Sequence, residues 1–238
     1  MIRIRKIQEG LKKIATIAGV LSNNGWAEAN AGNISLNVSD ALEDEFDSSD
    51  HQRPSEDYCF SKDTSIIITS SGSRMREIAE APEKFCGVLT FVAGKKGYFI
   101  SKFGQDEFIP TSEYPSHIGI HRYLVNSERS EKAVVHSHPD ELIAAMHKEE
   151  LNSEKSINSV FEKMHSEFSM LMPDKVGFIP FTDPGSKDLA NRTLEKLHKH
   201  KIVLWKDHGC ISIGNNLDSA LDNIEIVNKI AKVYLMQK

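Results

Sequence analysis

An apolar run of the kind found in buried β-strands ends in two histidines one residue apart, Val134-Val135-His136-Ser137-His138-Pro139. Alternate side chains of a strand point to the same face, so His136 and His138 would project side by side. Paired imidazoles suit zinc or another divalent transition metal. A pair that is only buried, with no ligand, is the structural alternative, because histidine is a common partly buried residue.

A second apolar run, residues 202–205, leads to His208-Gly209, where we expect the chain to turn at the glycine. Three imidazoles gathered at strand ends would leave one coordination position open for a substrate, as catalytic metal sites do. His117 and His121 form a rival pair, because residues four apart share one face of a helix. The His-Glu-x-x-His signature is absent, since Ile118 stands where the glutamate would be, and we interpret this pair as structural.

Composition narrows the class of protein. With 238 residues, the chain is long enough for one large domain or two small ones. A net charge of -5 and the lack of a basic stripe argue against a nucleic-acid partner. No stretch has the apolar length of a membrane span, so we expect no membrane partner. The three cysteines have unrelated spacings, which indicates neither disulfides nor a Cys-x-x-Cys zinc site and favours the reducing cytoplasm.

Hydrophobic periodicity predicts alternating helices and strands. The expected strands are 33–38, 65–69, 87–92 and 97–100. The expected helices are 7–21, which is amphipathic rather than a signal peptide, and others beginning near residues 115, 140, 186 and 217. Helices interleaved with short strands indicate a layered α/β fold. We interpret the acidic segment 40–57 as an exposed loop or hairpin excursion.

Two turns and one carboxylate have the chemistry of a substrate site. The turns 30–33 and 69–73 contain glycines, hydroxyls and backbone N–H groups that can cradle a phosphate, although neither is a P-loop and both residue types are also common in ordinary turns. Glu113 lies just before a predicted helix start at Pro115. It is either a helix N-terminal carboxylate or a general base beside the metal, and the residues alone leave both open.

Taken in order, these motifs resemble those of the class II aldolase/adducin family from about Gly25 to the C-terminus. They are Gly32-Asn33, Thr69-Ser70-Ser71-Gly72, Thr111-Ser112-Glu113, His136-Ser137-His138 and His208-Gly209. The resemblance implies that residues 1–238 form a single three-layer α/β/α domain with a central, largely antiparallel sheet. It also implies a homotetramer with active sites between subunits.

The same resemblance implies a set of site residues. Zinc would be held by His136, His138 and His208. The substrate phosphate would be bound by Gly32, Asn33, Ser71, Gly72, Thr111 and Ser112. Glu113 would be the catalytic base, and Glu167 a second carboxylate that serves the aldehyde end of the substrate from a neighbouring subunit. Tyr234 either reaches a neighbouring subunit's substrate or packs in the core.

The implied activity is that of a metal-dependent aldehyde-lyase acting on a phosphorylated ketose. The favoured substrate is L-rhamnulose 1-phosphate, with dihydroxyacetone phosphate and L-lactaldehyde as products. A divalent Lewis acid would stabilise the enediolate left when the C3–C4 bond breaks. Fuculose 1-phosphate cleavage and pentulose-phosphate 4-epimerisation would use the same site. A non-catalytic adducin-like module and a zinc hydrolase are alternatives of other classes.

Overall fold

The computed structural model of the chain describes residues 2–41, 52–53, 58–103 and 107–237. Most of the acidic segment 40–57 lies outside the described residues, and its interpretation as a loop or hairpin excursion stays a prediction. Among the described residues, no helix is both long and apolar enough to cross a membrane.

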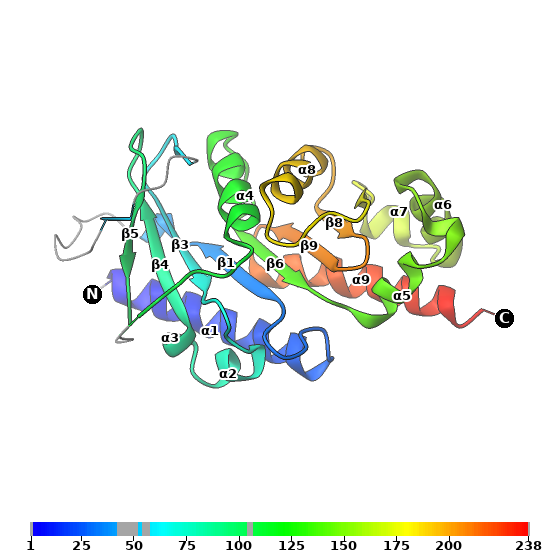
Figure 1. Cartoon of the computed structure of the whole chain (residues 1–238), viewed down its shortest axis with the longest axis horizontal. Coiled ribbons are helices and arrows are strands. Elements are labelled where there is room, and N and C mark those ends of the chain that lie inside the picture. Colours follow the sequence, from blue (N-terminus) through cyan, green and yellow to red (C-terminus); the bar gives the residue numbers. More distant parts are fainter. Residues whose placement is uncertain (1, 42–51, 54–57, 104–106, 238) are drawn as a thin grey trace.

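One mixed sheet runs through the described chain in the order β2-β5-β4-β3-β1-β6-β9-β8-β7 (Figure 1). Its strands are β1 (Asn33–Asn37), β2 (Gln52–Arg53), β3 (Thr64–Thr69), β4 (Cys86–Phe91), β5 (Tyr98–Ser101), β6 (Ala133–Ser137), β7 (Gly177–Ile179), β8 (Ile202–Trp205) and β9 (Gly209–Gly214). Every neighbouring pair is antiparallel except β7 and β8. The prediction of a central, largely antiparallel sheet is therefore confirmed.

Helices cover both faces of the sheet. They are α1 (Ile2–Asn23), α2 (Met75–Glu80), α3 (Pro82–Phe85), α4 (Tyr114–Asn126), α5 (Asp140–Met146), α6 (Glu154–Met164), α7 (Phe168–Leu171), α8 (Lys187–Leu197) and α9 (Leu217–Leu235). Helices α1 and α9 lie on one face, while α4 and α8 lie on the other (Figure 1). This is the expected three-layer α/β/α arrangement.

The alternation of side chains along each strand divides the core between the two faces. In β6, Ala133 and Val135 pack in the cluster that includes α1 and α9, whereas Val134 packs in the cluster that includes α4 and α8. All of these side chains are fully buried. Because residues of one strand alternate in direction, His136 points to the same face as Val134, toward α4.

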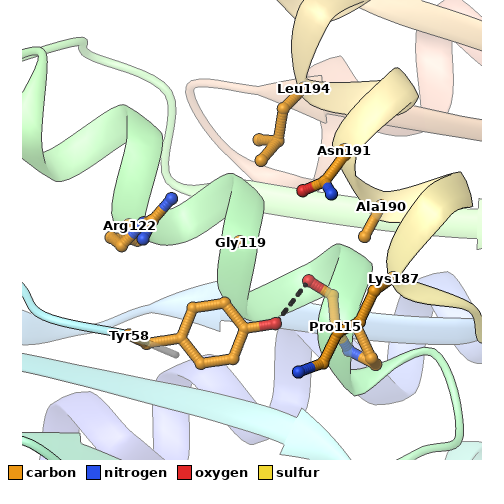
Figure 2. Close-up of a pocket in the computed structure, with 8 residues that line it drawn as sticks. All are labelled: Tyr58, Pro115, Gly119, Arg122, Lys187, Ala190, Asn191 and Leu194. Atoms are coloured by element: carbon orange, nitrogen blue, oxygen red, sulfur yellow. Dashed lines mark hydrogen bonds between the residues drawn. The ribbon is translucent and has the colours of Figure 1, made fainter. Parts of the chain in front are cut away.

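A pocket of about 230 Å³ is lined by residues of α4 and α8 and by Tyr58 (Figure 2). In its lining the hydroxyl of Tyr58 donates a hydrogen bond to the carbonyl oxygen of Pro115, at 3.1 Å. Pro115 occupies the first turn of α4, where its missing N–H costs no hydrogen bond. Tyr58 thereby holds the start of α4, the helix that Glu113 precedes.

Several elements were not predicted from the sequence, and one turn was placed wrongly. Helix α6 begins with a Ser153 and Ser156 capping box, in which serine replaces the glutamate that usually marks such a start. The turn before β9 lies at residues 206–208, with Asp207 at φ +62°, so Gly209 is the first residue of a strand rather than the turning point. A short polar side chain at Asp207 tolerates this left-handed conformation.

Gly209 is required by both its backbone conformation and its surroundings. Its φ is +147°, and a Cβ there would collide with the carbonyl oxygen of Ser137 and lie 3.0 Å from Cδ2 of His138. We expect Gly209→Ala to lower the free energy of unfolding by about 3 kcal/mol, through backbone strain and overpacking. Urea unfolding followed by circular dichroism measures this loss.

Gly94→Ala is the matched control, because Gly94 has φ +68° but no atom within 4 Å of its added Cβ. Gly94→Ala should therefore lower the free energy of unfolding only by the cost of a left-handed backbone, about 1 kcal/mol. Equal losses in the two variants would contradict a steric role for Gly209.

Candidate active site

The three histidines predicted as metal ligands lie together at one end of the central strands. His136 is the penultimate residue of the buried strand β6, His138 follows that strand, and His208 lies in the turn between β8 and β9. Strands β6 and β9 are antiparallel, with Ser137 opposite Cys210, so the turn before β9 meets the end of β6. One nitrogen from each ring belongs to a group whose members all lie within 4.8 Å of one another.

Hydrogen bonds fix which ring nitrogen of two of these histidines is protonated. The carbonyl oxygen of Cys210 only accepts, so the Nδ1–H of His136 donates to it at 2.8 Å. The carboxylate of Glu28 likewise accepts from the Nδ1–H of His138, at 3.0 Å. In the neutral rings both Nε2 atoms are then unprotonated. Acceptors that hold the far ring nitrogen in this way are the usual support of metal-ligating histidines.

The two unprotonated nitrogens face each other, with Nε2 of His136 and Nε2 of His138 only 3.1 Å apart. Two lone pairs at this distance repel unless a cation lies between them. Protonation is a poor remedy, because burial lowers the pKa of His136 well below its ordinary value, and the nearby His138 and His208 lower it further. Three imidazoles in this arrangement therefore suit a divalent transition metal.

His208 is also held as a neutral ring. Burial lowers its pKa to about 4, and the proximity of His138 acts in the same direction, while Glu28 opposes the shift. The indole of Trp205 stacks on the His208 ring, with 5.1 Å between centroids and 27° between planes. The same indole lies 4.7 Å from the His136 ring centroid. Trp205 thus forms an apolar wall behind two of the three histidine rings.

A cavity of about 290 Å³ opens in front of the three histidines. Among the described residues, its lining consists of Glu28, Ala29, Asn30, Ala31, Gly32, Asn33, Ser112, Glu113, His136, His138, Pro184 and His208. The cavity brings together the three predicted ligands, the predicted base and three of the six predicted phosphate-binding residues.

Glu113 is buried at the wall of this cavity, with an exposed fraction of 4%. Its Oε1 accepts a hydrogen bond from the backbone N–H of Gly185 at 2.9 Å, and Oε2 accepts from the Ser116 hydroxyl at 3.4 Å. Burial raises the pKa of the carboxyl group, although both hydrogen bonds act in the opposite direction. A carboxyl group whose pKa is raised toward neutrality can both take up and return a proton.

The remaining predicted phosphate-binding residues lie around Thr69, at the end of β3. Ser71 and Gly72 form an exposed turn there and do not line the cavity among the described residues. Thr111 is buried, and its backbone N–H donates to the carbonyl oxygen of Thr69 at 3.1 Å. The Thr69 hydroxyl in turn accepts from the N–H of Ile34, at 3.2 Å. These bonds tie the three predicted phosphate-binding segments together.

Two other candidates lie away from the cavity. Glu167 is an exposed residue immediately before α7 and is not part of the described cavity lining. The Tyr234 side chain packs against the main core cluster, and its hydroxyl donates to Glu150 of the same chain. Tyr234 therefore has a packing role within its own subunit.

His117 and His121 do not belong to the three-histidine group. Both are fully buried on α4, and both contact the hydroxyl of Ser35, with Nδ1 of His117 at 2.7 Å and Nε2 of His121 at 2.8 Å. Nε2 of His117 lies 2.9 Å from Oδ1 of Asn33. The pair is engaged in hydrogen bonds of the interior, as the structural interpretation expects.

Sequence reasoning missed the groups that support the site. Glu28 precedes the Gly32-Asn33 turn, but nothing in its local sequence signals that it lies beside His138, which is 110 residues away. The carbonyl of Cys210 and the N–H of Gly185 are backbone groups. Every residue type except proline has both a backbone N–H and a carbonyl, so the residue type carries no signal. Only the fold identifies them.

We expect Glu28→Ala to weaken Zn²⁺ binding about tenfold, because the acceptor that orients His138 is lost. Competition with a chromogenic chelator measures the dissociation constant. Glu77→Ala is the control, since Glu77 forms an exposed ion pair with Arg74 outside the cavity. An unchanged affinity in Glu28→Ala would show that His138 does not need this partner.

A pH dependence of stability follows from the buried histidines of α4. Burial lowers the pKa of both His117 and His121 from 6.5 to about 3. Between these pH values the unfolded chain binds protons that the folded chain does not, so stability falls as the pH falls. We expect His121→Phe to reduce this slope by about 1 kcal/mol per pH unit between pH 6 and 5.

Urea unfolding at a series of pH values measures the slope. Ser35→Ala is the control, because it removes a hydrogen-bond partner but no titrating group. It should lower stability at every pH and keep the wild-type slope, and a wild-type slope in His121→Phe would refute the assignment.

Comparison with known proteins gives the family of the chain. Residues 12–235 match the family model of the Class II Aldolase and Adducin N-terminal domain. The chain is 31% identical over 232 residues to the rhamnulose-1-phosphate aldolase of Bacteroides thetaiotaomicron, covering 96% of this chain and 86% of that protein. It is 30% identical over 233 residues to the rhamnulose-1-phosphate aldolase of Enterobacter sp. (strain 638), covering 95% and 83%.

The fold agrees with these sequence matches. A solved sugar-phosphate aldolase from Thermotoga maritima superposes with a TM-score of 0.81 at 31% identity, covering 96% of this chain and 94% of that one. The family model, the sequence relatives and the solved structure all agree with the resemblance that the order of motifs indicated. The chain belongs to the class II aldolase and adducin N-terminal domain family.

Proposed function

We propose that this chain is a zinc-dependent aldolase that cleaves L-rhamnulose 1-phosphate to dihydroxyacetone phosphate and L-lactaldehyde. The observation that carries the proposal is the presence of one buried carboxyl group, Glu113, in the same cavity as the three-histidine group. The choice of sugar is supported by the names of the relatives at 30% and 31% identity.

His136, His138 and His208 would hold the metal. When bound there, Zn²⁺ supplies positive charge beside a ketone oxygen, which stabilises the electron pair released by carbon–carbon cleavage. Three protein ligands leave a coordination position for substrate oxygens. The neutral state of the rings, favoured by their burial, keeps their lone pairs available for ligation.

Glu113 would transfer the proton to and from C3 of the substrate. When the C3–C4 bond breaks, its electron pair stays with the three-carbon phosphorylated fragment, and C3 must then gain a proton. The carboxyl group of Glu113 gives that proton in cleavage and removes it in the condensation direction. Its burial supports both roles, because the raised pKa brings the protonated form closer to neutral pH.

The substrate phosphate would be bound by Gly32, Asn33, Ser71, Gly72, Thr111 and Ser112. Gly32 has φ +76° in the turn before β1, and Gly72 has φ +74° in the turn after β3. Backbone N–H groups of such turns can bind an anion. Both turns are connected through Thr69. A phosphate fixed at one end of the cavity would set the register of the carbon chain against Glu113.

The aldehyde end of the cavity would be completed by another subunit. As the C4 hydroxyl becomes the carbonyl of lactaldehyde it loses a proton, and we assign this end to Glu167 of the partner subunit in a homotetramer. The exposure of Glu167 outside its own cavity supports this role. We also propose a cytoplasmic location, which is supported by the lack of a disulfide among Cys59, Cys86 and Cys210.

The test is a substrate screen of the zinc-loaded protein with rhamnulose, fuculose and pentulose phosphates. We expect dihydroxyacetone phosphate from L-rhamnulose 1-phosphate, loss of this activity with a strong chelator, and its return with Zn²⁺. If only fuculose 1-phosphate is cleaved, or only the pentulose phosphate is epimerised, the proposed site is retained and the proposed substrate is wrong. No reaction with any of the three would refute the aldolase proposal.

Glu113→Gln separates the base from the metal. It keeps the size and hydrogen-bonding capacity of the side chain but cannot exchange the C3 proton, so we expect kcat to fall about a thousandfold. The zinc content should stay at the wild-type level. Glu9→Gln, on the exposed side of α1, is the control and should retain full activity.

A further inference from the structure

A line of four buried polar side chains leads from the cavity into the interior. Asn33 lines the cavity, and behind it lie His117, Ser35 and His121, none of which lines the cavity itself. The line is continuous, with 2.9 Å from Asn33 to His117, 2.7 Å from His117 to Ser35 and 2.8 Å from Ser35 to His121. Ser35 and both histidines have no exposed surface. Only Asn33 can touch a substrate.

The donors and acceptors of the four side chains give the hydrogen bonds of the line one direction of donation. Oδ1 of Asn33 accepts, so Nε2 of His117 must carry the hydrogen. A neutral ring has a single N–H, and Nδ1 of His117 therefore accepts the hydroxyl proton of Ser35. That hydroxyl has no second proton, so its oxygen accepts from the Nε2–H of His121. Because burial lowers the pKa of both rings to about 3, each stays neutral near pH 7.

His121, at the inner end of the line, favours this direction of donation over the reverse one. Nδ1 of His121 is buried and has no hydrogen-bond partner among the described residues. In the direction derived above, this atom is an unprotonated nitrogen. In the reverse direction it would be an N–H donor without an acceptor, and buried unpaired N–H groups are rarer in proteins than under-satisfied acceptors.

We propose that His117 is a positioning residue for substrate phosphate, which acts with Ser35 and His121 to hold the Asn33 carboxamide with its oxygen inward. The amino group of Asn33 is then the group left to face the cavity. This inference rests on the proposed function, because it assigns an anion to the cavity. Two N–H donors attract a phosphate, whereas an amide oxygen turned outward would repel it.

The variants are chosen to separate hydrogen bonding from packing. His117→Gln keeps an N–H donor for Asn33 and an acceptor for Ser35 on one side chain, whereas His117→Leu fills similar space with neither. Ser35→Ala breaks the line one step further back and removes only one oxygen atom. Binding of inorganic phosphate to the zinc-loaded protein is measured by calorimetry, together with the zinc content and the thermal unfolding temperature.

We expect the phosphate dissociation constant to rise about tenfold in Ser35→Ala and His117→Leu, which corresponds to one lost hydrogen bond to a charged group. It should stay within about twofold of the wild-type value in His117→Gln, since the donor to Asn33 is retained. Zinc content should not change. With the ketose phosphate as substrate, the loss should be seen in KM rather than kcat, because phosphate binding is shared by ground state and transition state.

Unchanged phosphate affinity in both Ser35→Ala and His117→Leu would overturn the inference. Equal loss in His117→Gln and His117→Leu would also overturn it, because packing alone would then explain the effect. If the wild-type protein binds phosphate but cleaves no ketose phosphate, the proposed reaction fails, and the phosphate measurements still decide the role of His117. A wild-type protein that binds no phosphate would refute the positioning role as well.

Discussion

The register of three adjacent strands, β1, β6 and β9, is the constraint on which the site depends. Asn33 of β1 is opposite His136 of β6, and His136 is opposite Ile211 of β9. A slip of one residue would turn every side chain of β6 to the other face. His136 would then enter the apolar layer beneath α1 and α9, and the three-histidine group would lose its buried member.

Patterns within a short stretch of sequence predicted much of the fold and the centre of the site. The apolar run before His136 predicted a buried strand, and the two histidines that follow it do converge with His208. What the sequence could not give is the partner of each group. The distance between Glu28 and His138 depends on the sheet, and the identity of Gly185 as a donor to Glu113 depends on where α8 begins. The misplaced turn at Gly209 has a different cause, because glycine permits both a turn and a crowded strand start.

Three ionisable groups of the cavity, His136, His208 and Glu113, share one electrostatic character. Glu28 is the exception, because partial burial acts to raise the pKa of its carboxyl group, but the hydrogen bond to His138 and smaller contributions together lower it. Burial lowers the pKa of His136 and His208 and raises that of Glu113, so each of these three groups is driven toward its neutral form. Because these three groups are driven toward neutrality, the largest charges beside them belong to whatever enters the cavity. In the proposed reaction those are a divalent cation and a phosphate, and their mutual attraction is screened less in this buried setting than in water.

The indole of Trp205, which lies behind His136 and His208, has a spectroscopic consequence. The protein has two tryptophans, and both adjoin the site. Trp205 stacks on His208, while the carbonyl oxygen of Trp26 accepts the backbone N–H of His138 at 2.8 Å. Both indoles are almost completely shielded from solvent. Emission excited at wavelengths that tyrosine does not absorb therefore comes from Trp205, which stacks on His208, and from Trp26, whose backbone is hydrogen-bonded to His138. Such a spectrum can follow metal binding at the three histidines without an added label.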